Sequence, residues 1–203
     1  GGLDLHILGF YIDPGHAPLQ RRLERFREER LERVREMASR LGELGAPVNL
    51  EEVMEYAGHG VVGRPHLAAA LVEKKVVGNM KATFAQFLAE GAPAYVPKFK
   101  QTPQEAISLI KGRGGIVVLA HPMLSNVDEL IPGFVQAGLG GLEAHYPNCS
   151  ENVTRFYEGL ARKHQLVITG GSDAHGAAKK HTFIGKVRIP YDLVEKLKQA
   201  VSG

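Results

Sequence analysis

The second half of the chain alternates short apolar runs with helical segments, and this alternation constrains the fold more than any other feature. Strands are expected over residues 116–120, which are fully apolar, and over 141–145 and 166–169, and a helical pattern follows each of them. Strands and helices that alternate through short loops are typical of a parallel α/β architecture, either a barrel or a doubly wound sheet. The sequence therefore predicts an α/β fold for this part of the chain.

The region 16–92 has no such alternation and reads as a cluster of helices. The first of them, Pro18–Leu41, is rich in Arg and Glu and carries one apolar stripe at helical spacing, formed by Leu23, Phe26, Leu31, Val34, Met37 and Leu41. Shorter helices are expected over 50–57, 65–74 and 83–90. We expect a helical subdomain over 16–92, inserted into an α/β part made of residues 1–15 and 93–203.

Composition excludes several classes of protein. No apolar run approaches the roughly 20 residues that a helix needs to cross a bilayer, so no membrane span is expected. The 25 basic and 22 acidic residues leave a net charge of only +3. Arg and Glu are interleaved along Pro18–Leu41, so a basic nucleic-acid-binding helix is the least favoured interpretation. The single cysteine, Cys149, cannot form an internal disulfide and favours a reducing cytoplasm.

Polar side chains gather where the predicted strands end. His121 follows the strand 116–120 directly, and Glu143 and His145 lie in the strand 141–145. In parallel α/β proteins the functional groups collect at the carboxyl ends of the strands. These residues are therefore candidates for one site.

A glycine-rich loop after the strand 166–169 carries Asp173 and His175. Carboxylate and imidazole groups are ligands for Mn, Zn or Fe, and together with His121 this pair favours a metal site. His6 lies inside the first predicted strand, Leu3–Tyr11, where a histidine on its own is more often a core residue. Its assignment as a metal ligand depends on His121, Asp173 and His175.

The start of a predicted helix at Gly63–His66 offers a second kind of site. Free N–H groups and the helix dipole favour phosphate at a helix start, so Arg64 and His66 could bind an anion there. Simple capping of the helix explains the same residues equally well.

Six segments resemble one known family in order along nearly the whole chain. They are residues 5–13, 63–68, 93–98, 114–122, 141–143 and 169–176, and they are similar to the PHP (polymerase and histidinol phosphatase) superfamily. Within it they most resemble bacterial nucleoside 3′,5′-bisphosphate phosphatases and 5′–3′ exoribonucleases. The resemblance implies a distorted (β/α)7 barrel with a helical insertion. It also implies a cluster of divalent metal ions, with Mn favoured and Zn, Fe or Mg as alternatives.

The resemblance also implies roles for individual residues. His6, His121, Asp173 and His175 would be metal ligands, and Arg64, His66 and Lys98 would contact substrate phosphate. The expected reaction is hydrolysis of a phosphate ester by a metal-activated water. The expected substrate is a nucleotide, either a nucleoside 3′,5′-bisphosphate or a short 5′-phosphorylated RNA, and not double-stranded DNA.

One part of the family pattern is absent. The family's His-x-His motif, a following Asp, a further His and a metal-bridging Glu would all precede His6, and none is present. We therefore expect a truncated form that lacks the first barrel strands and is weakly active or inactive. The alternative is a non-catalytic nucleotide- or protein-binding module derived from the same fold.

Overall fold

The chain divides into two compact units, which we describe separately. The computed structural model describes residues 5–58, 60–112, 114–175 and 183–202. One unit comprises residues 1–19 and 101–203, and the other comprises residues 20–100. Leu3, assigned above to the first strand, and Gly176, assigned to the glycine-rich loop, lie outside the described residues.

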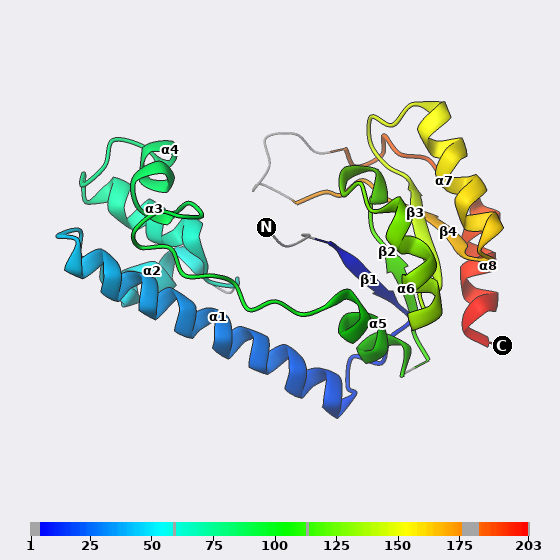
Figure 1. Ribbon diagram of the computed structural model, residues 1–203, viewed down its shortest axis with the longest axis horizontal. Coiled ribbons are helices and arrows are strands. Elements are labelled where there is room, and N and C mark those ends of the chain that lie inside the picture. The colour runs from blue at the N-terminus through cyan, green and yellow to red at the C-terminus, as the bar shows by residue number, and fades with distance from the viewer. Residues whose placement is uncertain (1–4, 59, 113, 176–182, 203) are drawn as a thin grey trace. The chain divides into compact units, whose positions relative to one another are not determined.

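The first unit is a mixed α/β structure with one four-stranded sheet. Two short 3₁₀ turns, at Pro122–Leu124 and Asp128–Leu130, lie between its second strand and the following helix. Its strands and helices are, in chain order, β1 (Ile7–Phe10), α5 (Pro103–Lys111), β2 (Ile116–Leu119), α6 (Ile131–Ala137), β3 (Gly141–His145), α7 (Glu151–Lys163), β4 (Val167–Gly170) and α8 (Tyr191–Ser202) (Figure 1).

The strands are ordered β1-β2-β3-β4 across the sheet. Strands β2, β3 and β4 are mutually parallel, as the alternation with helices predicts. Strand β1, for which the sequence predicts no direction, pairs antiparallel with β2, so that Ile7 lies opposite Leu119 and Phe10 opposite Ile116. Apolar periodicity identifies a strand but does not encode its direction. The antiparallel pairing places the beginning of β1 beside the end of β2.

Helices cover the sheet on both faces, which explains why β2 is apolar at every position. Successive side chains of a strand point to opposite faces. Val117 and Leu119 pack in a core with residues of α5, α6 and α7, whereas Ile116 and Val118 pack with Leu197 of α8. All four residues of β2 are buried. The sheet is thereby held rigid between two apolar layers.

The second unit consists of helices. Its elements are most of α1 (Ala17–Glu43), then α2 (Leu50–Ala57), α3 (Arg64–Glu73), α4 (Met80–Thr83) and a π-helical turn at Phe84–Leu88. The predicted stripe of α1 is fully buried only in its second half, where Val34, Met37 and Leu41 are inaccessible to solvent. They pack against a core that includes Leu67 and Leu71 of α3.

The helix predicted over 83–90 is instead split in two. Its start is shifted toward the N-terminus because the side chain of Asn79 caps the backbone N–H of Ala82 at 2.9 Å. The chain then continues as the π-helical turn Phe84–Leu88. Within the described residues, no helix is both long and apolar enough to cross a membrane.

We expect Gly141 to be essential for close packing of β3. A Cβ atom there would lie 2.7 Å from Val167 Cγ2 and 2.9 Å from Val118 Cγ2, so Gly141→Ala should lower the free energy of unfolding by about 1–3 kcal/mol. Gly159 is the matched control, because it lies inside α7 and a Cβ atom added there would meet no atom within 4 Å. Gly159→Ala should raise stability by about 0.5–1 kcal/mol. Urea unfolding followed by circular dichroism measures both, and equal effects would contradict the prediction.

Candidate metal centre

Two histidines meet at the edge of the sheet where β1 begins and β2 ends. The backbone N–H of Ala120 donates to the carbonyl of His6 at 3.0 Å, which extends the antiparallel ladder by one step. The Nδ1 atom of His6 and the Nε2 atom of His121 are 3.0 Å apart, within hydrogen-bond distance. The direction of β1 therefore brings together two of the four predicted metal ligands. His6 precedes β1 and is exposed, so the interpretation of it as a core histidine is wrong.

His121 is held in an unusual conformation. Its backbone lies in the left-handed region (φ 31°, ψ 56°), which a residue with a Cβ adopts at a cost of about 1–3 kcal/mol. The residue is only 8% exposed, and among the described residues its Nδ1 atom is buried without a hydrogen-bond partner. Strained backbone and an unsatisfied imidazole nitrogen are features that cluster at functional sites.

Glu143, a candidate from its place in the predicted strand but not one of the four predicted metal ligands, completes this part of the site. It is buried within β3, and its Oε2 atom accepts a hydrogen bond from the backbone N–H of His121 at 2.9 Å. Burial raises the pKa of its carboxyl group, the hydrogen bond from His121 opposes this effect, and the nearby Asp173 raises the pKa further. The sequence signal that identified it is a glutamate inside an otherwise buried strand.

Asp173 and His175 form the second pair of predicted ligands. The Nδ1 atom of His175 lies 2.6 Å from the carbonyl oxygen of Asp173 and 3.7 Å from its Oδ1 atom. Asp173 also has a left-handed backbone, with φ 47°. The two residues therefore contact each other, as their spacing in the loop predicts.

Tyr146 joins the two pairs. Its hydroxyl donates to Oδ2 of Asp173 at 2.9 Å, and its ring packs edge-on against the ring of His121 with centroids 5.4 Å apart. Burial, followed by the hydrogen bond to the Asp173 carboxylate, raises the pKa of the Tyr146 phenol to about 12. The phenol therefore stays protonated at neutral pH and remains a hydrogen-bond donor to Asp173.

The donor types of this cluster fit a divalent metal, but the described residues do not by themselves form a complete site. Imidazole and carboxylate groups suit Mn, Zn and Fe. Within the described part of the chain, no three His, Cys, Asp or Glu side chains are placed to hold one ion together. The contact between His6 and His121 also occupies one ring nitrogen of each histidine. The described cluster is thus a partial set of ligands.

The three predicted phosphate contacts lie in the helical unit. Arg64 and His66 are in the first turn of α3, and Lys98 lies in the segment that follows the π-helical turn. His66 accepts a hydrogen bond from the backbone N–H of Gly63 through Nδ1, at 3.0 Å, so it caps the helix. Arg64 donates to the carbonyl of Leu88 at 3.1 Å. Lys98 is exposed. Capping therefore accounts for one nitrogen of His66, and the phosphate-binding role of all three residues stays a prediction.

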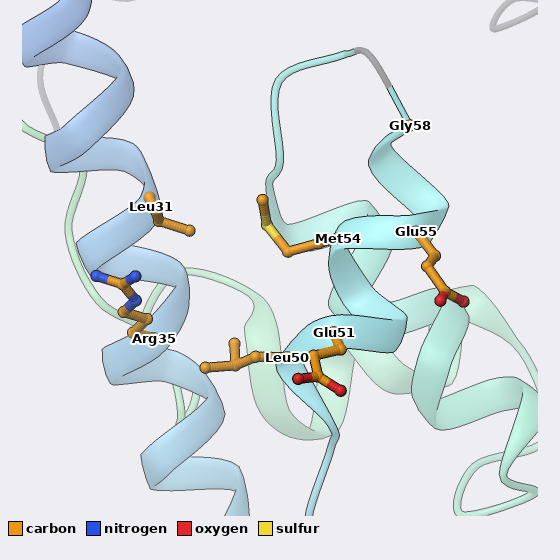
Figure 2. Close-up of a pocket in the computed structure, with 7 residues that line it drawn as sticks. All are labelled: Leu31, Arg35, Leu50, Glu51, Met54, Glu55 and Gly58. Carbon is orange, nitrogen blue, oxygen red and sulfur yellow. The ribbon is translucent and has the colours of Figure 1, made fainter.

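A groove between α1 and α2 offers no comparable chemistry. Figure 2 shows the side chains that line it, which are Leu31, Arg35, Leu50, Glu51, Met54 and Glu55, with Gly58 at its edge. This lining contains no histidine, cysteine or hydroxyl group. The groove therefore supplies no ligand set or nucleophile, and the sheet edge remains the candidate site.

We expect the buried Glu143 to make stability depend on pH. Its pKa is raised in the folded protein. At pH values between the ordinary glutamate pKa and this raised value, the carboxyl group is therefore protonated in the folded state and ionised in the unfolded chain. In that interval the unfolding free energy contributed by Glu143 falls as pH rises. The unfolding free energy of Glu143→Gln minus that of the parent should therefore increase with pH across the interval and then level off. Urea unfolding in EDTA at several pH values measures this, and a constant difference would contradict it.

Comparisons with known proteins find relatives over most of the chain. No family model matches the chain. The 3′,5′-nucleoside bisphosphate phosphatase of Chromobacterium violaceum is 30% identical over 187 residues, which cover 89% of this chain and 66% of that protein. The 5′-3′ exoribonuclease Rnm of Escherichia coli is 33% identical over 177 residues, which cover 85% of this chain and 60% of the relative. The chain thus spans about two thirds or less of the length of these relatives.

A solved structure extends the similarity to three dimensions. The structure, described as a metal-dependent phosphoesterase from Bifidobacterium adolescentis, matches 97% of this chain and 71% of its own with a TM-score of 0.77 and 29% identity. Sequence relatives and this structural neighbour point to the same group of proteins over nearly the whole chain. The chain belongs to the PHP-type phosphoesterases.

Proposed function

We propose that the protein is a metal-dependent phosphoesterase that hydrolyses phosphate esters of nucleotides, either nucleoside 3′,5′-bisphosphates or short 5′-phosphorylated RNA. The observation that carries the proposal is the convergence of His6, His121 and Glu143 with the Asp173 loop at one edge of the sheet. Relatives named as a nucleoside bisphosphate phosphatase and an exoribonuclease support the substrate class. In this proposal the four strands belong to a PHP-type barrel that carries the helical unit as an insertion.

His6, His121, Asp173 and His175 would hold the metal, and Glu143 lies beside them. A bound divalent ion lowers the pKa of a coordinated water and neutralises phosphate oxygens. The protein's own residues orient these ligands: Tyr146 fixes the carboxylate of Asp173, and the His121 backbone N–H holds Glu143. Because the described residues form only a partial ligand set, a complete cluster needs donors beyond them. A non-catalytic binding module remains the competing function.

Arg64, His66 and Lys98 are proposed to hold the substrate phosphate. Arginine presents a rigid, planar set of donors that suits phosphate oxygens, and lysine supplies a compact positive charge. Arg64 forms no ion pair with any carboxylate among the described residues, so its charge is available for an anion. All three residues can donate hydrogen bonds to phosphate oxygens, and none of them carries a negative charge that would repel the phosphate.

Loss of a metal ligand tests the proposed reaction directly. EDTA should abolish the release of phosphate from a nucleoside 3′,5′-bisphosphate in Mn²⁺. His121→Ala and Asp173→Asn should each lower kcat/KM at least about a hundredfold. Loss of a residue that only orients a metal ligand already costs about 10–100-fold in metal affinity or activity, and loss of a ligand itself should cost at least as much. His164→Ala, at the end of α7, is the control and should retain activity. Activity that survives EDTA or both ligand variants would overturn the metal-dependent mechanism in favour of the binding module.

Tyr146 allows a test that does not depend on turnover. Tyr146→Phe removes the donor that orients Asp173 and should weaken Mn²⁺ binding about tenfold, as measured by isothermal titration calorimetry. Tyr157 is a closely matched control, because its hydroxyl donates to Oδ1 of Asp128 at the same 2.9 Å and its pKa is likewise raised by burial and that bond. Tyr157→Phe should leave the Mn²⁺ affinity unchanged. Equal effects of the two variants would remove Asp173 from the metal site.

A further inference from the structure

The segment Tyr95–Lys100 runs along one side of α1 within the helical unit. Two arginines of α1 anchor its backbone: Arg40 donates to the carbonyl of Tyr95 at 2.7 Å, and Arg33 donates to the carbonyl of Val96 at 2.6 Å. Nearer the start of the helix, the rings of Phe26 and Phe99 lie with centroids 6.1 Å apart. The segment is thus antiparallel to α1 and is held at several points.

Aromatic rings and guanidinium groups alternate along this contact. The Tyr95 ring has two guanidinium groups near it, that of Arg33 at 5.7 Å and that of Arg64 at 5.5 Å from the ring centroid. The Phe99 ring has the guanidinium of Arg22 at 5.5 Å and is 52% exposed. We call this set the basic aromatic strip, and it consists of Arg22, Phe26, Arg33, Arg64, Tyr95 and Phe99.

Six arginines of α1 lie outside the strip. Two of them, Arg21 and Arg30, form no ion pair among the described residues. The other four form ion pairs one helical turn away on exposed faces: Arg25 with Glu29, Arg27 with Glu24, Arg35 with Glu32, and Arg40 with Glu36. Such pairs stabilise an isolated helix by only a few tenths of a kcal/mol. Among the described residues, no carboxylate pairs with Arg22, Arg33 or Arg64. The strip therefore keeps an excess of positive charge.

Arg33 is the residue at which this excess is most evident. Burial, followed by the positive charges of Arg64 and Arg30, lowers the pKa of its guanidinium. Its Nη2 atom is buried and has no hydrogen-bond partner among the described residues. Glu29, one turn earlier, pairs with Arg25 through Oε1, while its Oε2 is buried and makes no hydrogen bond within the same described part of the chain. The described residues thus supply no counter-ion for the charge of the strip.

We propose that the basic aromatic strip binds single-stranded RNA, with a base stacked on Phe99, phosphates contacted by Arg22 and Arg64, and the charge of Arg33 adding to the positive potential of the strip. Exposed aromatic rings among cationic side chains are the usual means of binding a single strand without sequence preference. Tyr95 and Phe99 are four positions apart along the chain, a span of at most about 14 Å. A span of this length gives the strip room for more than one nucleotide.

This inference rests on the proposed function, because the nucleotide substrate class is what makes a nucleic acid the occupant of the strip. It goes further by selecting an oligonucleotide over a mononucleotide. Arg64, a proposed phosphate contact, is also one end of the strip, so a 5′-phosphate held there would leave the following nucleotides along Tyr95 and Phe99. A mononucleotide would occupy only the Arg64 end.

The sequence contains no tryptophan, so a single one introduced at Phe99 reports on stacking without interference. In EDTA, 5′-phosphorylated hexaadenylate should quench the fluorescence of Phe99→Trp. It should bind at least about tenfold more tightly than 5′-AMP, because each stacked base contributes. The matched control is Phe156→Trp, at a similarly exposed position (55%) on α7 of the other unit. Hexaadenylate should leave its fluorescence unchanged, and equal quenching or no quenching at Phe99→Trp would overturn the proposal.

Two truncations separate stacking from charge. Phe99→Ala should weaken binding of fluorescein-labelled hexaadenylate about tenfold, without changing how affinity depends on salt. Arg22→Gln should instead make the slope of log affinity against log salt shallower by about 0.7, the value for one phosphate contact on a single strand. Circular dichroism confirms that each variant is folded. Unchanged binding by folded Phe99→Ala overturns the inference.

The same measurements distinguish this inference from the proposed function. If the parent protein hydrolyses nucleoside bisphosphates but binds hexaadenylate independently of Phe99, the inference fails and the function stands. If binding depends on Phe99 but no phosphate is released from any nucleotide in Mn²⁺, the strip is supported and the hydrolytic function fails.

Discussion

The candidate site depends on the antiparallel pairing of β1 with β2. Functional groups of a parallel sheet collect at the carboxyl ends of its strands, and His121 lies at such an end. His6 precedes its strand, so a parallel β1 would place it at the opposite edge. The antiparallel register, with Ile7 opposite Leu119, brings His6 to the same edge as His121. One reversal of strand direction therefore decides whether the two imidazoles can act together.

The edge of the sheet that carries the candidate site contains strained and unsatisfied groups, and the apolar core on either side of the sheet compensates for their cost in stability. Left-handed backbone at His121 and Asp173, a buried carboxyl at Glu143 and an unsatisfied imidazole nitrogen all lower stability. The strands leading to this edge are apolar and buried, above all β2, which has helices over both of its faces. Burial along the strands offsets the strain at their ends, which is how a rigid scaffold can hold groups in positions that they would not adopt alone.

The sequence was sufficient for those parts of the site that depend on local pattern. His121 after an apolar run, and Asp173 with His175 in a glycine-rich loop, follow from strand periodicity and spacing. Three other features depend on contacts between distant segments, and periodicity does not contain them: the direction of β1, the hydrogen bond from His121 to Glu143, and the link from Tyr146 to Asp173. The π-helical turn at Phe84–Leu88 was missed because the same residues fit an ordinary helix.

Charge along α1 shows why composition alone misjudges a surface. Counted in sequence, α1 has eight arginines and six glutamates, so it carries only a small positive excess. In three dimensions four of the arginines pair with glutamates, whereas Arg33 lies beside Arg64 without a carboxylate partner among the described residues. Arg33 holds the carbonyl of Val96 and Arg64 holds that of Leu88, and both guanidinium groups lie near the ring of Tyr95. Two like charges at one ring repel each other, and an anion between them would turn that repulsion into attraction. These contacts of the fold therefore place two positive charges where a phosphate would offset their repulsion.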